Sequence, residues 1–307
     1  MKGVVIKSTG SWYKVLCGKQ RFDCRIKGRI RLDDAKSTNP IAVGDWVECE
    51  QENETQAVIA SIYERTNYII RKAANLSKQS HIIAANVDMA YLVVTVHSPR
   101  TLLSFIDRFL LSAEAYSIPC TLLINKCDLC TSDTDRKIIQ NWIEIYRKAG
   151  YEILCVSAHT SENIETLYRL MAGKTVVFAG NSGVGKSSLL NAIAPEAASR
   201  VAGISKSHNK GKHTTTFAEM YELPNGARII DTPGVKSFGL LDFEKGELSH
   251  YFPEIFNVSK QCQFHNCTHT HEPQCAVQRA VQQNEIAPSR YENYVSCLID
   301  ENTKHRK

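Results

Sequence analysis

A glycine-rich segment in the second half of the chain constrains the fold more than any other feature of the sequence. It fits the pattern G-x-x-x-x-G-K-[S/T] and reads Gly180-Asn181-Ser182-Gly183-Val184-Gly185-Lys186-Ser187, followed by Ser188. An apolar run at 175–179 precedes the segment, and apolar residues at helical spacing follow it. This context predicts a strand, a tight turn and a helix. Such a turn binds phosphate through its backbone N–H groups and the positive N-terminus of the helix.

Two side chains at the start of the predicted helix have the chemistry that bound phosphates require. The ammonium group of Lys186 would reach the β- and γ-phosphates of a nucleotide, and the hydroxyl group of Ser187 would ligate Mg²⁺. We expect the rest of the segment, through Ser188, to surround the phosphates. A glycine-rich turn with an exposed lysine is the alternative, but the strand and helix on either side favour a phosphate site.

Strands and helices alternate from about residue 73 to residue 236. The expected strands lie at 89–96, 120–124, 152–156, 175–179, 216–223 and 227–230, and the expected helices lie at 102–116, 136–149, 163–171 and 186–194. Alternation of this kind predicts an α/β domain with a mostly parallel sheet that helices cover on both faces. Ligands of such sheets bind beyond the carboxyl ends of the strands, where the glycine-rich segment begins.

Two further motifs follow expected strands and have the chemistry of guanine recognition. Asn125-Lys126-Cys127-Asp128 ends one strand, and Ser157-Ala158-His159 ends the next. The Asp128 carboxylate can accept hydrogen bonds from the N1–H and 2-amino groups of guanine, a donor pair that adenine lacks. The Asn125 side chain can bind the base edge, the Lys126 stem can lie over the base, and a backbone N–H near Ser157 and Ala158 can meet O6. Alone, N-K-x-D is a common surface turn.

The last motif of the domain, Asp231-Thr232-Pro233-Gly234, also follows an apolar strand. Its Asp231 carboxylate can hold Mg²⁺ through water, and its Gly234 N–H can meet the γ-phosphate. Before it, a basic segment at 200–213 without any acid ends at three threonines. We expect one of these threonines to ligate Mg²⁺. The sequence leaves open which of Thr214, Thr215 and Thr216 does so, and we favour Thr214 or Thr215.

These motifs resemble those of the translation-factor and Ras-like GTPases, in a different order along the chain. In that class the phosphate motif comes first and the base motif last, whereas here the base motif precedes the phosphate motif. A circular permutation preserves such a site because the strands still meet at one edge. The residue after Gly234 is Val235, where many of these GTPases have a glutamine that orients the attacking water. Turnover should therefore be slow unless another group acts, and His213 is the nearest candidate; an ordinary exposed histidine is the alternative.

The first 72 residues predict a small barrel that is suited to nucleic acid. Five short strands separated by turn signals are typical of an OB-fold. The stretch 14–31 holds seven Lys or Arg residues against one acid, with Trp12, Tyr13 and Phe22 in or beside it. Basic and aromatic side chains on such a barrel bind nucleic acid. A solvated strand face with core aromatics is the alternative.

A cluster of cysteines and histidines near the C-terminus predicts a metal site. The spacing C-x4-C-x-H-x5-C supplies three thiolates and one imidazole, the donors of a closed tetrahedral zinc site. Its residues are Cys262, Cys267, His269 and Cys275, with His265 and His271 as competing donors. A set of four protein ligands leaves no position for substrate, so the zinc should be structural.

Composition narrows the setting in which these sites act. The chain has 307 residues, 43% hydrophobic and 22% charged, and it contains 11 cysteines. An odd number of scattered cysteines argues against a disulfide framework. No apolar run approaches the length of about 20 residues that crosses a bilayer. The N-terminus becomes charged too soon for a signal peptide, so we expect a cytoplasmic protein without membrane association.

Taken together, the barrel, the permuted domain and the Cys₃His cluster resemble the RsgA family, bacterial GTPases of small ribosomal subunit biogenesis. The resemblance implies a factor that acts late in maturation of the small (30S) subunit. Such a factor binds the subunit and its rRNA near the decoding region and leaves after GTP hydrolysis, which the subunit stimulates. In this family a histidine before the triple threonine is thought to be catalytic, and it matches His213.

Three domains are expected from this reading: an OB-fold RNA-binding domain at 1–72, a circularly permuted GTPase domain at 73–236 and a mainly helical zinc-binding domain at 237–307. The expected ligands are GTP or GDP with Mg²⁺ and one structural Zn²⁺, and nothing in the sequence indicates an oligomer rather than a monomer. Two alternatives stay open. The chain could be a nucleotide-gated RNA-binding module with negligible turnover, or a GTPase that acts on another RNA.

Overall fold

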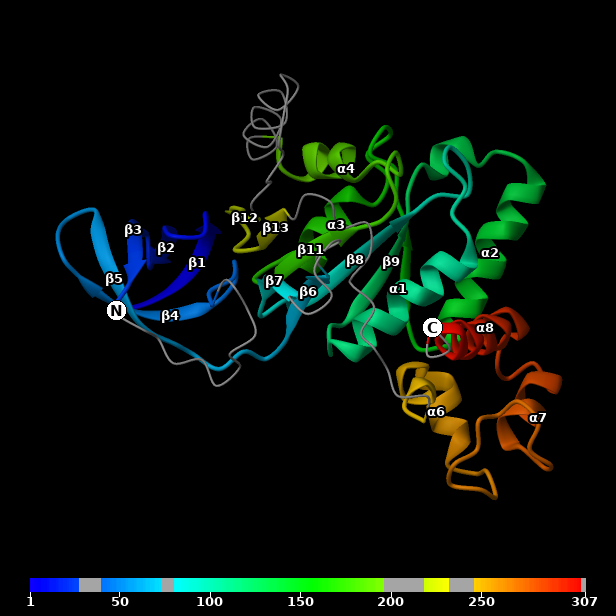
Figure 1. The fold of residues 1–307 in the computed structure, drawn as a ribbon. Helices are drawn as coiled ribbons and strands as arrows, with labels where there is room; N and C mark the ends of the chain where they lie inside the picture. Colours follow the sequence, from blue (N-terminus) through cyan, green and yellow to red (C-terminus); the bar gives the residue numbers. More distant parts are fainter. Residues whose placement is uncertain (28–39, 73–79, 196–217, 232–245, 305–307) are drawn as a thin grey trace.

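The computed structural model describes residues 1–27, 40–72, 80–195, 218–231 and 246–304. Figure 1 shows three parts in a row: a β-barrel in blue at one end, a sheet with helices in the middle and a helical part in orange and red at the other end. The multidomain architecture predicted from the sequence is confirmed in this arrangement.

The N-terminal barrel closes through five strands. Its strand order is β1-β2-β3-β5-β4, and β4 pairs back to β1. All neighbours are antiparallel except β3 and β5, which run parallel. The strands are β1 (Lys2–Ser8), β2 (Tyr13–Cys17), β3 (Gln20–Ile26), β4 (Trp46–Gln51) and β5 (Gln56–Ile62). Alternate side chains point inward, so Tyr13 and Phe22 lie in the barrel core at 1% and 2% exposure. These two aromatics are therefore core residues and not part of an RNA-binding surface.

The central sheet has the order β10-β9-β8-β11-β13-β12. Neighbours run parallel except β12, which pairs antiparallel with β13. The strands are β8 (Met89–Val94), β9 (Cys120–Ile124), β10 (Glu152–Cys155), β11 (Thr175–Ala179), β12 (Glu219–Glu222) and β13 (Arg228–Asp231). The carboxyl ends of the five parallel strands therefore share one edge, as the sequence predicts.

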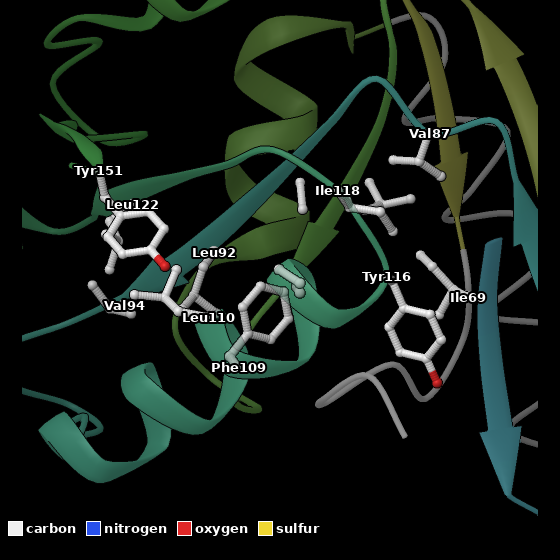
Figure 2. Close-up of a cluster of buried hydrophobic side chains, with 14 of the residues drawn as sticks. Ile69, Val87, Leu92, Val94, Phe109, Leu110, Tyr116, Ile118, Leu122 and Tyr151 are labelled. Atoms are coloured by element: carbon white, nitrogen blue, oxygen red, sulfur yellow. The ribbon is translucent and has the colours of Figure 1, made fainter. Parts of the chain in front are cut away.

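Helices cover both faces of this sheet and enclose two separate cores. The helices are α1 (Leu103–Ala115), α2 (Asp133–Lys148), α3 (Ile164–Met171) and α4 (Lys186–Ile193). Side chains of α1 and α2 pack on one face, and side chains of α3 and α4 pack on the other. Strand β8 is buried on both sides because successive side chains point to opposite faces: Leu92 enters the first core and Val93 the second. Figure 2 shows the first core, where Phe109 and Leu110 of α1 lie against Leu92.

Two features of the sheets are absent from the sequence-based prediction. Strand β1 of the barrel pairs antiparallel with β12, so the barrel and the central domain share one sheet of 11 strands. A separate antiparallel pair, β6 (Tyr68–Lys72) with β7 (Ser80–Ala85), connects the barrel to the central domain.

The C-terminal part is helical and has a core of its own. It comprises a short 3₁₀ helix (Leu248–Tyr251), α6 (Pro253–Ser259), α7 (Ala276–Gln282) and α8 (Pro288–Lys304). Phe252, Ile255, Val277 and Tyr294 are buried there, and Leu111 of α1 completes the cluster. No helix in the parts of the chain that the structure describes is long and apolar enough to cross a membrane.

Candidate nucleotide and metal sites

The glycine-rich segment forms the turn between β11 and α4. Gly180, Gly183 and Gly185 have φ values of 136°, 84° and 95°, a region that L side chains rarely adopt. The two outer positions also lack room: a Cβ atom would lie 2.3 Å from the Val93 carbonyl oxygen at Gly180, and 2.3 Å from the Asn125 Nδ2 atom at Gly185. Glycine at these positions lets the turn approach the neighbouring strand ends closely.

Within the turn, the side chains predicted to bind phosphate lie at the helix start. The Lys186 ammonium group donates to the carbonyl oxygens of Gly180 (2.7 Å) and Asn181 (2.8 Å), and it therefore lies inside the curve of the turn. Ser187 and Ser188 are exposed in the first turn of α4, and Ser182 is exposed in the loop. Val184 is fully buried and anchors the loop in the core.

The base motif contacts the glycine-rich turn directly. Asn125 donates through Nδ2 to the Val184 carbonyl oxygen (2.8 Å), and Lys126 donates through Nζ to the Gly183 carbonyl oxygen (2.8 Å). Asn125 is 2% exposed, and its Oδ1 atom has no partner among the described residues. A buried amide oxygen of this kind is free to accept a hydrogen bond from a ligand.

The third motif fixes the orientation of the Asp128 carboxylate. The Ser157 hydroxyl donates to Asp128 Oδ1 (2.6 Å) and accepts from the backbone N–H groups of His159 and Thr160. The Ser157 N–H is engaged by the Glu162 carbonyl oxygen, whereas no hydrogen bond among the described residues uses the Ala158 N–H. Ala158 is thus the residue of this turn with a donor available to a base.

Asp231 ends β13 one strand away from the glycine-rich turn. The register pairs Ile230 with Val177, so Asp231 reaches the same sheet edge as the end of β11. Burial, together with the neighbouring Glu219 carboxylate, raises the pKa of Asp231. A cation beside it would favour the charged form. The remaining predicted residues of this site, Gly234, His213, Thr214 and Thr215, lie outside the described residues, as does Val235.

The predicted metal ligands converge in the C-terminal part. The four donor atoms of Cys262, Cys267, His269 and Cys275 lie within 4.8 Å of one another. The sulfur atom of Cys275 lies 3.9 Å from that of Cys262, 3.8 Å from that of Cys267 and 3.5 Å from His269 Nδ1. Metal–sulfur bonds of about 2.3 Å in a tetrahedron place sulfur atoms about 3.8 Å apart. The spacing therefore fits a tetrahedral ion, and His265 and His271 are not part of the group.

The electrostatics of this cluster also favour a cation. Burial raises the pKa of the Cys267 thiol to about 12 and raises that of Cys275 as well. Three thiolates can share so small a volume only when a positive charge compensates them. Burial also lowers the pKa of His269, which keeps its imidazole in the neutral form that a metal requires.

Residues outside the predicted set hold the metal-binding loop. The backbone carbonyl of His269, whose φ is 61°, accepts from the Tyr291 hydroxyl (2.7 Å) and from Gln278 (3.2 Å). The Glu272 carboxylate accepts from the backbone N–H groups of Thr268 and Thr270. Burial opposes its ionisation, but hydrogen bonds from the Thr268 hydroxyl and from the backbone N–H groups of Thr268, Glu272 and His271 lower the pKa of Glu272 to about 2. Sequence reasoning missed these residues because no spacing rule links them to the ligands.

The fold and these contacts define a class before any comparison is made. A parallel sheet whose edge carries a glycine-rich phosphate turn, an N-K-x-D motif and an Asp at the end of β13 is the arrangement of a P-loop GTPase domain. The base motif precedes the phosphate turn along the chain, so the domain is circularly permuted.

Comparison with known proteins narrows this class to a family. The profile of the RsgA GTPase family matches residues 62–241, and that of the RsgA N-terminal domain matches residues 2–59. A Bacteroides fragilis protein named small ribosomal subunit biogenesis GTPase RsgA is 50% identical over 308 residues, covering 100% of this chain and 99% of the relative. A Christiangramia forsetii protein of the same name is 47% identical, covering 100% of this chain and 98% of the relative.

Solved structures agree with this assignment. The crystal structure of YjeQ from Thermotoga maritima has a TM-score of 0.80 and 36% sequence identity, covering 98% of each chain. The structure of YloQ, described as a circularly permuted GTPase, has a TM-score of 0.80 and 34% identity, covering 100% of this chain and 96% of that one. The chain belongs to the RsgA family and is a GTP-hydrolysing enzyme.

Proposed function

We propose that this GTPase acts in late maturation of the small ribosomal subunit and binds guanine nucleotide at the sheet edge described above. The observation that carries the nucleotide site is the contact of Asn125 and Lys126 with the glycine-rich turn. It links base recognition and phosphate binding into one surface. The subunit role is supported by relatives whose names state it, at 47–50% identity over their full lengths.

In this site each predicted residue has a specific task. Asp128, held by Ser157, accepts the two guanine donors, and the Ala158 N–H meets O6. Gly180 to Ser188 surround the phosphates, with Lys186 on the β- and γ-phosphates. Ser187 ligates Mg²⁺ together with Thr214 or Thr215, Asp231 holds the ion through water, and Gly234 contacts the γ-phosphate.

The base contact is tested by exchanging the acceptor pair for one acceptor and one donor. Asp128→Asn should weaken GTP binding by about 2–3 kcal/mol, the scale of hydrogen bonds to a charged group. It should favour xanthosine triphosphate, whose 2-position is a carbonyl. Asp133→Asn is the matched control, because its side chain is 89% exposed at the start of α2. Unchanged guanine preference in a competition assay would remove Asp128 from the site.

The barrel supplies the RNA contact in this proposal, with a smaller set of residues than the sequence suggested. Trp12 is 47% exposed, and Lys19 and Arg21 are exposed without an acidic partner among the described residues. By contrast, Lys14 pairs with Asp23, Arg25 with Glu52 and Lys27 with Glu50. Unpaired cations and an exposed indole ring on the same barrel are suited to phosphate contact and base stacking.

Cosedimentation tests which RNA-containing partner the chain binds. With a non-hydrolysable GTP analogue, the chain should bind separated small ribosomal subunits and not transfer RNA. The double variant Lys19→Gln, Arg21→Gln should weaken that binding and lower its salt dependence. With fewer phosphate contacts, fewer counterions are released from the RNA on binding. Lys14→Gln is the control, since its ammonium already pairs with Asp23. Equal binding to transfer RNA would favour action on another RNA.

Hydrolysis forms the last part of the proposal. His213 orients the attacking water or stabilises developing charge when rRNA near the decoding region binds the basic segment at 200–213, and the factor leaves after hydrolysis. His213→Ala should keep GTP affinity and subunit binding but lose about 10²–10⁴-fold of the subunit-stimulated rate. Single-turnover hydrolysis on purified small subunits measures this. A wild-type rate in the variant would assign the step to another group.

The structural metal in this proposal is zinc, held by the Cys₃His cluster, and the enzyme works in the cytoplasm.

A further inference from the structure

We propose that His97 is a positioning residue for nucleotide binding, which it supports by anchoring the turn that holds Lys126 against the phosphate loop. The turn, residues 95–101, connects β8 to α1. This inference rests on the proposed nucleotide site, because it concerns the side chain of Lys126 within that site.

The base of the turn is closed by two buried threonines. The Thr95 N–H donates to the Thr101 hydroxyl (3.1 Å), and the Thr101 N–H donates back to the Thr95 carbonyl oxygen (2.9 Å). Both residues are at most 2% exposed. The Thr95 hydroxyl also donates to the Pro99 carbonyl oxygen (2.5 Å). The two ends of the turn and Pro99 are therefore fixed, and any freedom that the turn has lies at residues 96–98.

The tip of the turn, Ser98 and Pro99, lies against the phosphate loop. The Ser98 carbonyl oxygen accepts from Lys126 Nζ (2.5 Å), and the same ammonium donates to the Gly183 carbonyl oxygen (2.8 Å). A Cβ atom at Gly183 would lie 3.4 Å from Cδ of Pro99, so the proline ring packs on the loop. Lys126 thus bridges the turn and the phosphate loop, with one acceptor on each side.

The tip is held from outside the turn as well as from within it by Thr95. Ser98 has a φ of 49°, a left-handed conformation that is uncommon for serine. His97, the residue before it, supplies that hold: its Nε2 atom lies 2.6 Å from Asp135 Oδ1 at the start of α2. The His97 ring bonds to α2, and the hydrogen bond to Lys126 is made by the Ser98 carbonyl. His97 therefore acts on the site indirectly, through Ser98 and Lys126.

Its partner on α2 is itself fixed in place. Asp135 and Ser132 form a capping box, in which each side chain bonds the backbone N–H of the other. The hydrogen bond from His97 and then that from Ser132 lower the pKa of Asp135, which keeps it charged as an acceptor. The Asp135 side chain is 12% exposed and that of His97 is 49% exposed, so the pair is formed at the rim of the site.

Loss of this anchor should release the Ser98 carbonyl from Lys126. A long lysine side chain with one acceptor in place of two samples more rotamers, and its stem is no longer held where the base lies. His97→Ala should therefore raise the dissociation rate of GDP about three- to tenfold, the scale of one ordinary hydrogen bond. The stimulated rate at saturating GTP should not change, because no reacting atom is touched.

The test is a double-mutant cycle on the full-length protein, with stopped-flow dissociation of a fluorescent GDP derivative as the readout. His97→Ala should accelerate dissociation in the wild-type background and have no further effect in a Lys126→Met background. His97→Gln, which keeps a donor for Asp135, should restore most of the slow rate. Arg136→Ala is the control, since it breaks an exposed pair with Asp133 at the same helix start and touches no residue of the turn.

Two outcomes would overturn the inference. Equal acceleration in both backgrounds would mean that His97 acts on the general stability of the domain. An unchanged rate in His97→Ala, with normal GDP binding by the wild type, would show that the turn keeps its position without the anchor. Failure of the wild type to bind the fluorescent GDP would instead refute the proposed nucleotide site.

Discussion

The barrel and the C-terminal helices are attached to the GTPase domain in different ways. The barrel is joined by the edge pairing of β1 with β12, where the Lys7 ammonium lies 3.1 Å from the Glu219 carboxylate. Both side chains are about one-third exposed, at 32% and 27%. The C-terminal part is joined through Arg290, whose side chain is 1% exposed and pairs with Asp107 of α1 (2.9 Å) and Glu254 of α6 (2.7 Å).

The two attachments differ in what they bury: the C-terminal part is held to α1 by buried charges, whereas the barrel places Val4, Ile6 and Leu16 in the apolar core of the GTPase domain. Asp107 also accepts from the Tyr146 hydroxyl (2.9 Å) and from Asn293, so three helices meet at one carboxylate. A buried charge cannot separate from its partners without a large desolvation penalty. An exposed ion pair at the edge of a sheet exchanges with water at little cost.

The two attachments also contact different parts of the GTPase domain. Strand β12 forms a hairpin with β13, and β13 ends at Asp231 in the proposed γ-phosphate motif. The barrel is therefore attached to a strand pair that leads into the site, and Figure 1 shows it next to that hairpin. Strand β12 thus links Asp231 to the barrel, whereas the C-terminal part packs on α1.

The largest effect is expected at the metal centre. Cys275→Ser or Cys267→Ser should abolish metal binding and unfold the C-terminal part, because apparent zinc-binding free energies in small domains are about 10–16 kcal/mol. GDP binding should persist. Metal analysis and thermal unfolding measure the two effects. Cys297 is buried in the same core but is not one of the four predicted ligands, so Cys297→Ala should keep the metal. Absence of zinc from the purified wild-type protein would end this interpretation.

A smaller but still large effect is expected for the buried ion cluster. Arg290→Met leaves Asp107 and Glu254 buried without a cation, and removing one partner of such a pair costs about 3–5 kcal/mol of unfolding free energy. Chemical denaturation measures this cost. Adding Asp107→Asn and Glu254→Gln should recover much of it. Full stability of the single variant would mean that water reaches the cluster and that the attachment is not buried.

The stability of the Arg290→Met variant should also depend on pH in a specific direction. Burial already raises the pKa of Asp107 in the presence of Arg290, and without the arginine charge this pKa should rise further. An acid with a folded-state pKa above its unfolded value binds protons preferentially in the folded state, so stability increases as pH falls through the raised pKa. The loss of unfolding free energy that Arg290→Met causes should therefore become smaller on acidification. A deficit that grows would show that another group dominates.

The strand-end motifs show what could be predicted from the sequence. A motif that follows an apolar run at a parallel strand end must lie at one sheet edge, so the convergence of Asn125, Ser157 and Gly180 follows from local patterns. The metal ligands could be predicted for a similar reason, since all four lie within 14 residues of chain from Cys262 to Cys275. The strand order could not be predicted from the sequence, and no local pattern predicts that β1 pairs with β12.

Contacts between distant residues account for most of what was missed. Arg290 is 183 residues from Asp107, and a charged residue near the chain end gives no sequence signal that it is buried. His97 and Asp135 meet across 38 residues, on a turn and a helix start that look like ordinary surface. Tyr13 and Phe22 lie in the basic, aromatic stretch that predicts RNA binding, yet strand alternation places them in the barrel core. Exposure of an aromatic residue depends on register, which the sequence left open.

The smallest effect is expected at the barrel attachment, and it is the one that tests the comparison most directly. A partly exposed pair such as Lys7 and Glu219 is worth about 0.2–1 kcal/mol, and salt screens it. Lys7→Ala, Glu219→Ala and the double variant form a cycle whose coupling energy, measured by denaturation at low and high salt, should be small and should vanish at high salt. A coupling as large as that of the Arg290 cluster would show that this ion pair, rather than the apolar core shared through Val4, Ile6 and Leu16, dominates the attachment of the barrel.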